Sequence, residues 1–349
     1  MPSENQRLRS PALASSGQVR RRTSIVWLAT LASLTTALAA CGSNSSPTST
    51  ASGSTAKKVK VTFIEGVAGD PFYETMACGA KAQAAKDNVD LTVQGAKNWD
   101  VSLQIPLLNS VIAAKPDALF IAPNDSNALI QPLKQASSAG IKVVLVDTTL
   151  ADTSFVASSI ASDNYKGGQT AADALAKLIG EKGPVLLVGG QPGVSTAEAR
   201  QKGFEDGLKK YPNISYLGNV FTSNGVAKIS QLVSAQLAAH PDLAGIFALS
   251  TDQSEGANNA VKAAGKAGQV KLVGFDAGPT QVDQLRNGVV QALVAQQPAQ
   301  IGADGVDQAA AAARGGSVTK QIGTDSTVIT KDNVDDPTVS KYLYKTTCS

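Results

Sequence analysis

Histidine and cysteine, which build most zinc sites and many nucleophilic catalytic centres, are almost missing from this chain of 349 residues. It contains one histidine, His240, and three cysteines, Cys41, Cys78 and Cys348, which lie far apart in the sequence. A zinc site needs several His or Cys ligands, and a Ser–His or Cys–His pair needs a histidine at its nucleophile. The composition therefore argues against both kinds of enzyme, and we expect no cofactor and no metal.

The loop signatures of nucleotide-binding and hydrolytic enzymes are missing too. The turn from Gly66 to Asp70, after the first apolar run, does not follow the G-x-G-x-x-G pattern of dinucleotide-binding folds. No phosphate loop ends in Gly-Lys-Ser or Gly-Lys-Thr, and the stretch from Gly193 to Ala197 lacks the second glycine of a G-x-S-x-G elbow. An exported α/β enzyme is therefore the weakest of the alternatives.

Excess positive charge is confined to the start of the chain. Residues 1–40 contain five arginines and one glutamate, so the remainder has 26 basic and 27 acidic residues. A nucleic-acid-binding surface needs a basic patch in the folded part of the protein. We therefore expect no nucleic-acid partner.

The first 40 residues have the organisation of a secretory signal peptide. A basic segment precedes the apolar stretch Ile25–Ala40, which ends in small residues. This stretch is shorter than the ~20 residues that a membrane-spanning helix needs. We expect residues 1–40 to be a signal peptide and the protein to be exported.

Cys41 stands directly after the apolar stretch. The sequence Leu38-Ala39-Ala40-Cys41 resembles the lipobox of bacterial lipoproteins, which implies cleavage before Cys41 and its lipidation. Residues 42–56 are almost entirely Gly, Ser, Thr, Asn, Pro and Ala, a composition typical of a flexible tether. We expect a lipidated cysteine and tether at 41–56, which would hold the protein at the extracytoplasmic face of the cell membrane. An ordinary cleavage site followed by a chance cysteine is the alternative.

The two remaining cysteines, Cys78 and Cys348, are candidates for a disulfide. An exported protein lies in a compartment that permits disulfides, and one bridge would use both thiols. We expect this pair to fix the C-terminal tail to an early helix, with two free thiols as the alternative.

The body of the chain alternates short apolar runs with Ala-rich amphipathic stretches. Apolar runs without alternation, separated by helices, indicate buried parallel strands, so we predict an α/β fold with two doubly wound parallel sheets. The predicted strands are Val59–Ile64, Leu91–Val93, Ala118–Ala122, Val143–Val146, Phe155–Ile160, Val185–Val188, Ile214–Val220, Gly245–Leu249, Lys271–Phe275 and Val290–Val294. The predicted helices are Phe72–Lys86, Val101–Ala114, Asn127–Ala139, Lys166–Ile179, Ala197–Lys210, Val226–Ala239, Gln253–Ala264, Pro279–Asn287 and Pro298–Arg314.

Polar side chains gather where the predicted strands end. Ligands of open parallel sheets bind beyond the carboxyl ends of the strands, and carboxylates and amides can hydrogen-bond several hydroxyls at once. Aromatic rings nearby could cover the C–H face of a sugar. The candidate binding residues are Asp70, Phe72, Tyr73, Asp147, Ser162, Asp163, Asn164, Arg200, Thr251, Asp252, Phe275, Asp276 and Gln296. Helix capping is the alternative role for individual aspartates such as Asp163.

The order and spacing of several short motifs resemble bacterial sugar-binding proteins of the ribose-binding type, with the type I periplasmic-binding fold. The resemblance covers roughly Val59 to Thr330. The motifs are Asp70-Pro71-Phe72-Tyr73, Ile160-Ala161-Ser162-Asp163-Asn164 with Gly167-Gly168, Ala199-Arg200 through Gly203-Phe204, Val273-Gly274-Phe275-Asp276, and Ala295-Gln296 with Gln300-Ile301-Gly302.

This resemblance implies two lobes joined by three crossover segments, with a ligand cleft that closes by a hinge motion. The expected N-terminal lobe is 57–162 plus 297–323, and the expected C-terminal lobe is 163–296 plus 324–345. Carried over by position, Phe72 and Tyr73 would stack on the ligand, and its hydroxyls would be bound by Asp147, Arg200, Asp276 and Gln296. The implied partners are the permease and ATPase subunits of an ABC importer, served by a monomeric binding protein.

Four positions depart from the family's pattern. Ala122 replaces a cleft asparagine, Thr148 replaces an arginine, Thr251 replaces an asparagine, and Asp70 stands where the family has its early cleft asparagine. These differences favour a pentose other than ribose, or an open-chain polyol such as a tetritol, pentitol or hexitol.

Two other proteins of this fold are alternatives. A repressor would carry an N-terminal helix-turn-helix where this chain has an export signal. A chemosensory or quorum-signal receptor could have the same cleft, and the sequence leaves that alternative open.

Overall fold

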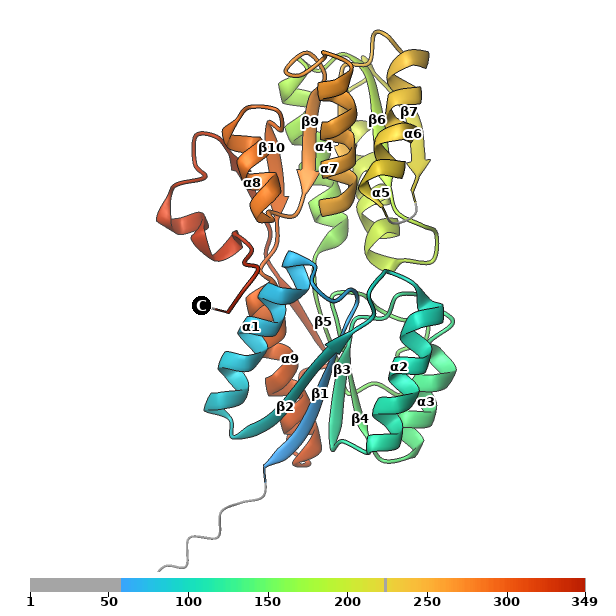
Figure 1. Ribbon diagram of the computed structural model, residues 1–349, viewed down its shortest axis with the longest axis vertical. Helices are drawn as coiled ribbons and strands as arrows, with labels where there is room; N and C mark the ends of the chain where they lie inside the picture. Colours follow the sequence, from blue (N-terminus) through green and yellow to red (C-terminus); the bar gives the residue numbers. More distant parts are fainter. Residues whose placement is uncertain (1–57, 223–224, 349) are drawn as a thin grey trace, which may run out of the picture. The chain divides into compact units, whose positions relative to one another are not determined.

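The computed structural model describes residues 58–222 and 225–348, and the expected signal peptide, the lipidation site Cys41 and the tether lie outside them. The described residues form two six-stranded sheets interleaved with helices (Figure 1). The predicted fold class, α/β with two doubly wound and mostly parallel sheets, is confirmed.

The first sheet is wholly parallel and has the order β11-β5-β4-β3-β1-β2. Its strands are β1 (Val59–Glu65), β2 (Val89–Gly95), β3 (Ala118–Ile121), β4 (Lys142–Val146), β5 (Ser158–Ser162) and β11 (Gln321–Thr324). The helices that accompany it are α1 (Pro71–Lys86), α2 (Val101–Ala114), α3 (Ile130–Ser138) and α9 (Pro298–Ala313). Although α9 comes late in the chain, it packs along α1 (Figure 1).

The second sheet repeats this plan with the order β12-β10-β9-β8-β6-β7, and only β12 runs antiparallel to its neighbour. Its strands are β6 (Gly183–Gly189), β7 (Ile214–Phe221), β8 (Gly245–Ala248), β9 (Lys271–Phe275), β10 (Ala292–Ala295) and β12 (Thr327–Thr330). The helices that follow its strands or pack on it are α4 (Asn164–Leu178), α5 (Ser195–Leu208), α6 (Val226–Ala239), α7 (Thr251–Ala263), α8 (Pro279–Arg286) and the 3₁₀ helix η1 (Pro337–Tyr342).

Between β1 and β12, the described chain passes between the two sheets three times. The first passage follows β5, the second follows β10, and the third joins β11 to β12. Both sheets reverse their strand order at the same place, between β1 and β3 in the first and between β6 and β8 in the second. Such reversals leave a crevice at the carboxyl ends of the strands, where ligands bind in open α/β sheets.

Most predicted elements are present within a few residues of their predicted bounds. The strand predicted at Phe155–Ile160 is the main shift, because β5 starts at Ser158, where the pairing with Val144 begins. Strands β11 and β12 and helix η1 were not predicted. The two strands have four residues each, and β11 (Gln-Ile-Gly-Thr) has no apolar run to mark it.

The sheet cores are closely packed apolar layers. In the first sheet, the rings of Phe63 and Phe120 stack with centroids 4.5 Å apart, and both are fully buried. In the second, Phe247 lies between Phe204 and Phe275, with ring centroids 4.9 and 6.5 Å away. Burying side chains of this size stabilises the fold by roughly 1.5–3 kcal/mol each, so both sheets have rigid cores behind their strand ends.

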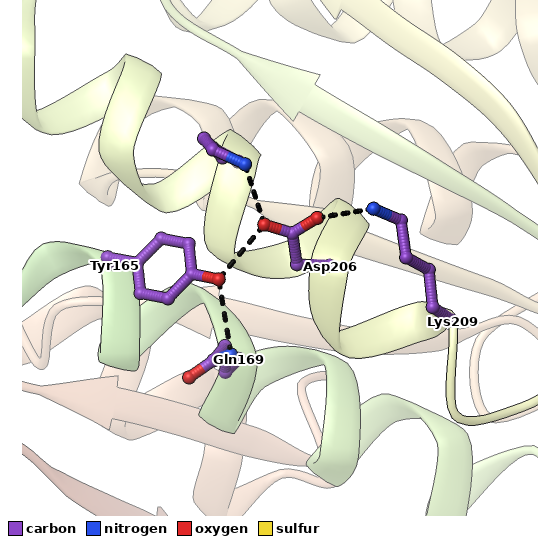
Figure 2. Close-up of polar contacts among 5 residues, drawn as sticks. Tyr165, Gln169, Asp206 and Lys209 are labelled. Carbon is purple, nitrogen blue, oxygen red and sulfur yellow. Dashed lines mark hydrogen bonds and ion pairs between the residues drawn. The ribbon is translucent and has the colours of Figure 1, made fainter.

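Helices α4 and α5 approach each other so closely that glycine is needed at their contact. A Cβ on Gly168 would collide with the carbonyl oxygen of Arg200, and one on Gly203 would collide with the carbonyl oxygen of Tyr165. At the surface the same two helices share a polar network centred on Asp206, which accepts from the Tyr165 hydroxyl at 2.9 Å and pairs with Lys209 (Figure 2). Exposed ion pairs contribute little, so the glycine contact sets the spacing.

We expect Gly168→Ala to destabilise the protein. Alanine favours a helix by up to ~1 kcal/mol over glycine, but the collision with the α5 backbone should cost more, with a net loss of ~1–3 kcal/mol. Chemical denaturation would measure this. Gly323→Ala is the control, because its Cβ would meet no atom within 4 Å. Equal stability of the two variants would contradict the prediction.

Candidate ligand-binding site

The carboxyl ends of both sheets enclose a cavity of about 140 Å³. The loops and helices after β1, β2 and β4 form one wall, and those after β6, β7, β8, β9 and β10 form the other. Nine of the thirteen candidate residues line this cavity: Asp70, Phe72, Tyr73, Asp147, Arg200, Thr251, Asp252, Asp276 and Gln296. The structure therefore brings together most of the side chains that the strand-end argument selected.

Asp147 follows β4 and is fixed by a tyrosine. Its backbone is left-handed, with φ at 62°, a conformation that aspartate tolerates better than most residues. Its Oδ2 accepts a 2.6 Å hydrogen bond from the hydroxyl of Tyr73, which comes from the first turn of α1. Asp70 fixes the first turn of α1, because its Oδ1 caps the helix by accepting a hydrogen bond from the backbone N–H of Phe72.

Asp276 follows β9 and repeats the arrangement in the second sheet. Its φ is 76°, and its Oδ1 accepts from Gln296 Nε2 at 2.7 Å and from the hydroxyl of Tyr344 at 2.9 Å. The other amide atom of Gln296, Oε1, is buried and has no protein partner in the described part of the chain. Asp276 and Gln296 thus present acceptor oxygens, and the hydrogen bonds between them and from Tyr344 fix the position of the Asp276 carboxylate.

Arg200 is the cation of the cavity, and its guanidinium is held on three sides. Nε donates to Asn164 Oδ1 and Nη1 donates to the carbonyl oxygen of Leu249, both at 2.8 Å. The guanidinium carbon lies 3.8 Å from the centroid of the Phe275 ring, a cation–π contact. Nη2 has no protein partner within the described residues, so this donor can serve a ligand.

Four candidates lie outside the cavity wall: Ser162, Asp163, Asn164 and Phe275. Asn164 and Phe275 support Arg200, as described above. The hydroxyl of Ser162 lies 3.1 Å from that of Thr324 and so links β5 to β11. Asp163 is exposed and caps α4 by accepting from the backbone N–H of Lys166, which is the capping role considered from the sequence.

Trp99 is the main cavity residue that the sequence reading missed. It lies in the loop after β2 and stacks against Tyr73, with ring centroids 6.3 Å apart, and its Nε1 donates to the carbonyl oxygen of Asn124. The strand-end argument could have found it, because β2 is parallel to β1 and ends at the same sheet edge. Residues not selected from the second wall include Gln191, Thr196, Thr222, Ser250 and Gln253.

Two of the family departures lie behind the wall. Thr148 is buried and donates its hydroxyl to the carbonyl oxygen of Pro123 at 2.8 Å, so it supplies no cation to the cavity. Ala122 is also fully buried, and its carbonyl oxygen accepts from Gln104 Nε2. The other two, Asp70 and Thr251, line the cavity directly.

Burial shifts the titration of the cavity carboxyls. Desolvation, aided by the neighbouring charge of Asp276, raises the pKa of Asp70 to about 7. Desolvation also raises the pKa of Asp147 to about 6, against the opposing effects of Arg200 and the Tyr73 hydroxyl. The pKa of Tyr73 is raised well above 10 by burial and by Asp147, so its hydroxyl keeps its proton and remains a donor.

Between residues 58 and 348, leaving out 223 and 224, no group of three or more His, Cys, Asp or Glu side chains is placed to hold a metal ion. Within the same residues, no helix combines the length and apolar character that crossing a membrane requires.

We expect Asp70→Asn to change how stability of the ligand-free protein depends on pH. A carboxyl whose pKa rises from 3.8 unfolded to about 7 folded makes the protein less stable as pH increases between those values. The variant keeps a capping side chain but cannot ionise, so it should gain up to ~4 kcal/mol over the parent between pH 4 and pH 7.5. Urea denaturation at both pH values would measure this, with Asp163→Asn as the capping control. A difference independent of pH would contradict the prediction.

Comparison with known proteins places this geometry in a family. The family model of the periplasmic binding protein domain matches residues 61–317. The ribose import binding protein of Salmonella typhimurium is 30% identical over 81% of this chain and 94% of its own length. The D-ribose/D-allose-binding protein of Pseudomonas aeruginosa is 32% identical over 78% of this chain and 87% of its own.

A solved structure extends the likeness to three dimensions. An ABC transporter solute-binding protein from Agrobacterium vitis, bound with α-D-tagatopyranose, is 42% identical and superposes with a TM-score of 0.81. The match covers 82% of this chain and all of that one. These relatives are binding proteins, which confirms both the family indicated by the sequence motifs and the expectation that the chain is not an enzyme. The chain belongs to the periplasmic binding protein family, in the ribose-binding group of sugar-binding proteins that serve ABC importers.

Proposed function

We propose that this protein captures a monosaccharide or a sugar alcohol in the cavity between its two sheets and delivers it to the permease and ATPase of an ABC importer. The observation that carries the proposal is the cavity wall itself. Aromatic faces (Phe72, Tyr73 and Trp99) stand beside the fixed carboxylates Asp147 and Asp276 and the guanidinium of Arg200. Apolar faces and hydroxyl-binding groups side by side match the two kinds of surface on a sugar.

The size of the cavity supports a small ligand. A cavity of about 140 Å³ is several-fold larger than the roughly 10–15 Å³ that a single water needs, so it can admit a small ligand. One relative is a ribose import binding protein, another binds D-ribose or D-allose, and the solved structure holds α-D-tagatopyranose; all of these sugars are monosaccharides.

The chemistry of the wall favours a pentose other than ribose, a related monosaccharide, or an open-chain polyol. Thr148 supplies no cation, and Asp70 stands where the family has an asparagine. With a pKa of about 7, Asp70 can be protonated near neutral pH and donate a hydrogen bond, or ionise and accept two. Such a group can adapt to hydroxyls whose positions differ from those of ribose.

The two walls belong to different sheets, so a bound ligand would join them. We propose that residues 57–162 with 297–323 and residues 163–296 with 324–345 act as two lobes that close on the ligand by a hinge at the three passages. Tyr73 and Asp147 would contact the ligand from one side, and Arg200, Asp276 and Gln296 from the other. A ligand that binds only the closed form stabilises that form by its own binding free energy.

We further propose that the mature, monomeric protein is held at the extracytoplasmic face of the membrane by a lipid on Cys41. The sequence Leu38-Ala39-Ala40-Cys41 and the tether behind it support this arrangement. A tethered binding protein stays near its transporter, which raises its effective concentration there.

Isothermal titration with D-ribose, D-allose, D-tagatose, D-arabinose, erythritol, xylitol and mannitol would test the ligand class. We expect saturable one-to-one binding of at least one compound, with D-ribose not the tightest. Arg200→Lys should weaken that binding about 10–150-fold, because lysine loses the donor fork and the hold of Asn164 and Phe275. The matched control is Arg314→Lys, an exposed arginine that donates to the carbonyl oxygen of Asp87. Tight binding of ribose with no binding of any polyol would overturn the polyol proposal, and binding of none of the compounds would overturn sugar capture.

Cys41→Ser tests the anchor. We expect the parent protein to fractionate with membranes and to incorporate a labelled fatty acid, since acyl chains provide the membrane affinity. The variant should lose both properties and keep its ligand affinity. Membrane fractionation and labelling of both proteins in a bacterial host would measure this, and labelling of the serine variant would contradict the assignment.

A further inference from the structure

The C-terminal tail, residues 343–348, makes a fourth passage between the two sheets. It leaves η1, which packs with β12 of the second sheet, and the Tyr344 N–H then donates to the carbonyl oxygen of Ala277 at 3.0 Å. One residue later, the Lys345 N–H donates to Thr75 Oγ1 on α1 at 2.6 Å. The tail ends with the disulfide between Cys348 and Cys78, the pair that the sequence predicts. It is therefore attached by a hydrogen bond to the loop after β9 of the second sheet, and by a hydrogen bond and a disulfide to α1, which accompanies the first sheet.

Tyr344, in the middle of this tail, contacts the cavity residues from behind. It is 5% exposed, and its hydroxyl donates to Asp276 Oδ1 at 2.9 Å while accepting from the Gln296 N–H at 3.2 Å. Its ring meets that of Phe72 edge-on, with centroids 5.7 Å apart. One side chain thus touches residues from both walls of the cavity without lining it.

The arrangement is the counterpart of the Tyr73–Asp147 pair. Because the two sheets share one strand order, β9 corresponds to β4, and both strands lead into an aspartate with positive φ that accepts a tyrosine hydroxyl. In the first sheet the tyrosine comes from α1, the helix after β1. In the second, the helix after β6 is α5, which supplies Arg200 instead. The tail provides the tyrosine that this helix does not.

We propose that Tyr344 is a positioning residue for the ligand site and that the Cys78–Cys348 disulfide holds it in place, so that the tail acts as a covalently closed strap. This inference rests on the proposed sugar-binding function of the same cavity. Tyr344 and Gln296 both bond Oδ1 of Asp276, which leaves Oδ2 for a ligand hydroxyl and restrains rotation of the carboxylate. Without the tyrosine hydroxyl, the carboxylate has one fixed donor fewer and more freedom to turn.

Tyr344→Phe tests the positioning role, because it keeps the ring and removes only the hydroxyl. The probe is the tightest binder among the seven compounds titrated above. We expect its dissociation constant to rise at least tenfold, while the urea midpoint of the ligand-free protein moves much less than in Tyr344→Leu, which also loses the ring. Tyr165→Phe is the matched control, since it removes a tyrosine–aspartate bond of the same 2.9 Å length from the exposed α4–α5 surface (Figure 2).

Unchanged affinity in Tyr344→Phe would overturn the positioning role. A loss of affinity in Tyr344→Phe would also overturn that role if Tyr344→Phe and Tyr344→Leu lowered the stability of the ligand-free protein equally. If the parent protein binds none of the compounds, the proposed function itself fails, and this result is distinct from either of the others.

The strap is tested by opening the disulfide in two ways. The double variant Cys78→Ala/Cys348→Ala removes both thiols. A phosphine can instead reduce the disulfide of the parent protein without any mutation, because Cys348 is exposed to solvent. We expect both to weaken binding several-fold at a temperature where circular dichroism shows the protein folded. Tyr344→Phe should then have a smaller effect in the cysteine-free background, since sites that act through one shared stretch of backbone are not additive in a double-mutant cycle. Unchanged affinity in both opened forms, or full additivity, would overturn the strap.

Discussion

Among the residues that the structure describes, four carboxylates and one guanidinium line one small cavity, and this imbalance of charge explains much of what surrounds it. Asp70, Asp147, Asp252 and Asp276 line the space together with Arg200. An ionised carboxylate without a partner is costly to bury, so the protein must neutralise the charge or satisfy it with donors. It does both: burial raises the pKa of Asp70 and Asp147 towards neutrality, and tyrosine hydroxyls and an amide donate to Asp147 and Asp276.

The donors also determine where the carboxylates stand. Asp147 and Asp276 both occupy left-handed backbone, a conformation that a non-glycine residue keeps only when its surroundings hold it there. Tyr73 comes from a helix capped by Asp70, and Tyr344 comes from a tail closed by a disulfide. The same tyrosine–aspartate hydrogen bond is therefore supported by a helix, α1, beside the first sheet and by the irregular C-terminal tail beside the second.

This difference in support explains what could be predicted from the sequence. The residues after β4, β9 and β10 follow apolar runs, so the strand-end rule selected Asp147, Asp276 and Gln296 directly. Trp99 was missed because β2 is a half-exposed edge strand, whose short apolar run Leu91–Val93 gives only a weak strand signal before the loop that contains Trp99. Tyr344 gave no signal, because its tail has neither hydrophobic periodicity nor a strand end.

The candidates that the structure moves away from the cavity have a physical reason for their positions. Asn164 and Phe275 are next to cavity residues in sequence or space, but they contact Arg200 and do not line the cavity. A guanidinium must be held on several sides to present one edge in a fixed direction, and that need is invisible in a one-dimensional pattern. Predicting residue types at strand ends thus identified the neighbourhood of the site, whereas the division between ligand contacts and their supports required the fold.

The same charge imbalance narrows the chemistry of the ligand. The wall is rich in acceptors, including the buried Oε1 of Gln296, whereas Arg200 is its cation. A sugar acid or a sugar phosphate would bring negative charge into a cavity lined by four carboxyls, and like charges close together repel strongly in a buried site. A neutral polyhydroxyl compound instead brings hydroxyls that donate to the carboxylate oxygens and accept from the guanidinium, without adding charge. The electrostatics of the cavity therefore support the proposal of a neutral sugar or alditol over that of a charged derivative.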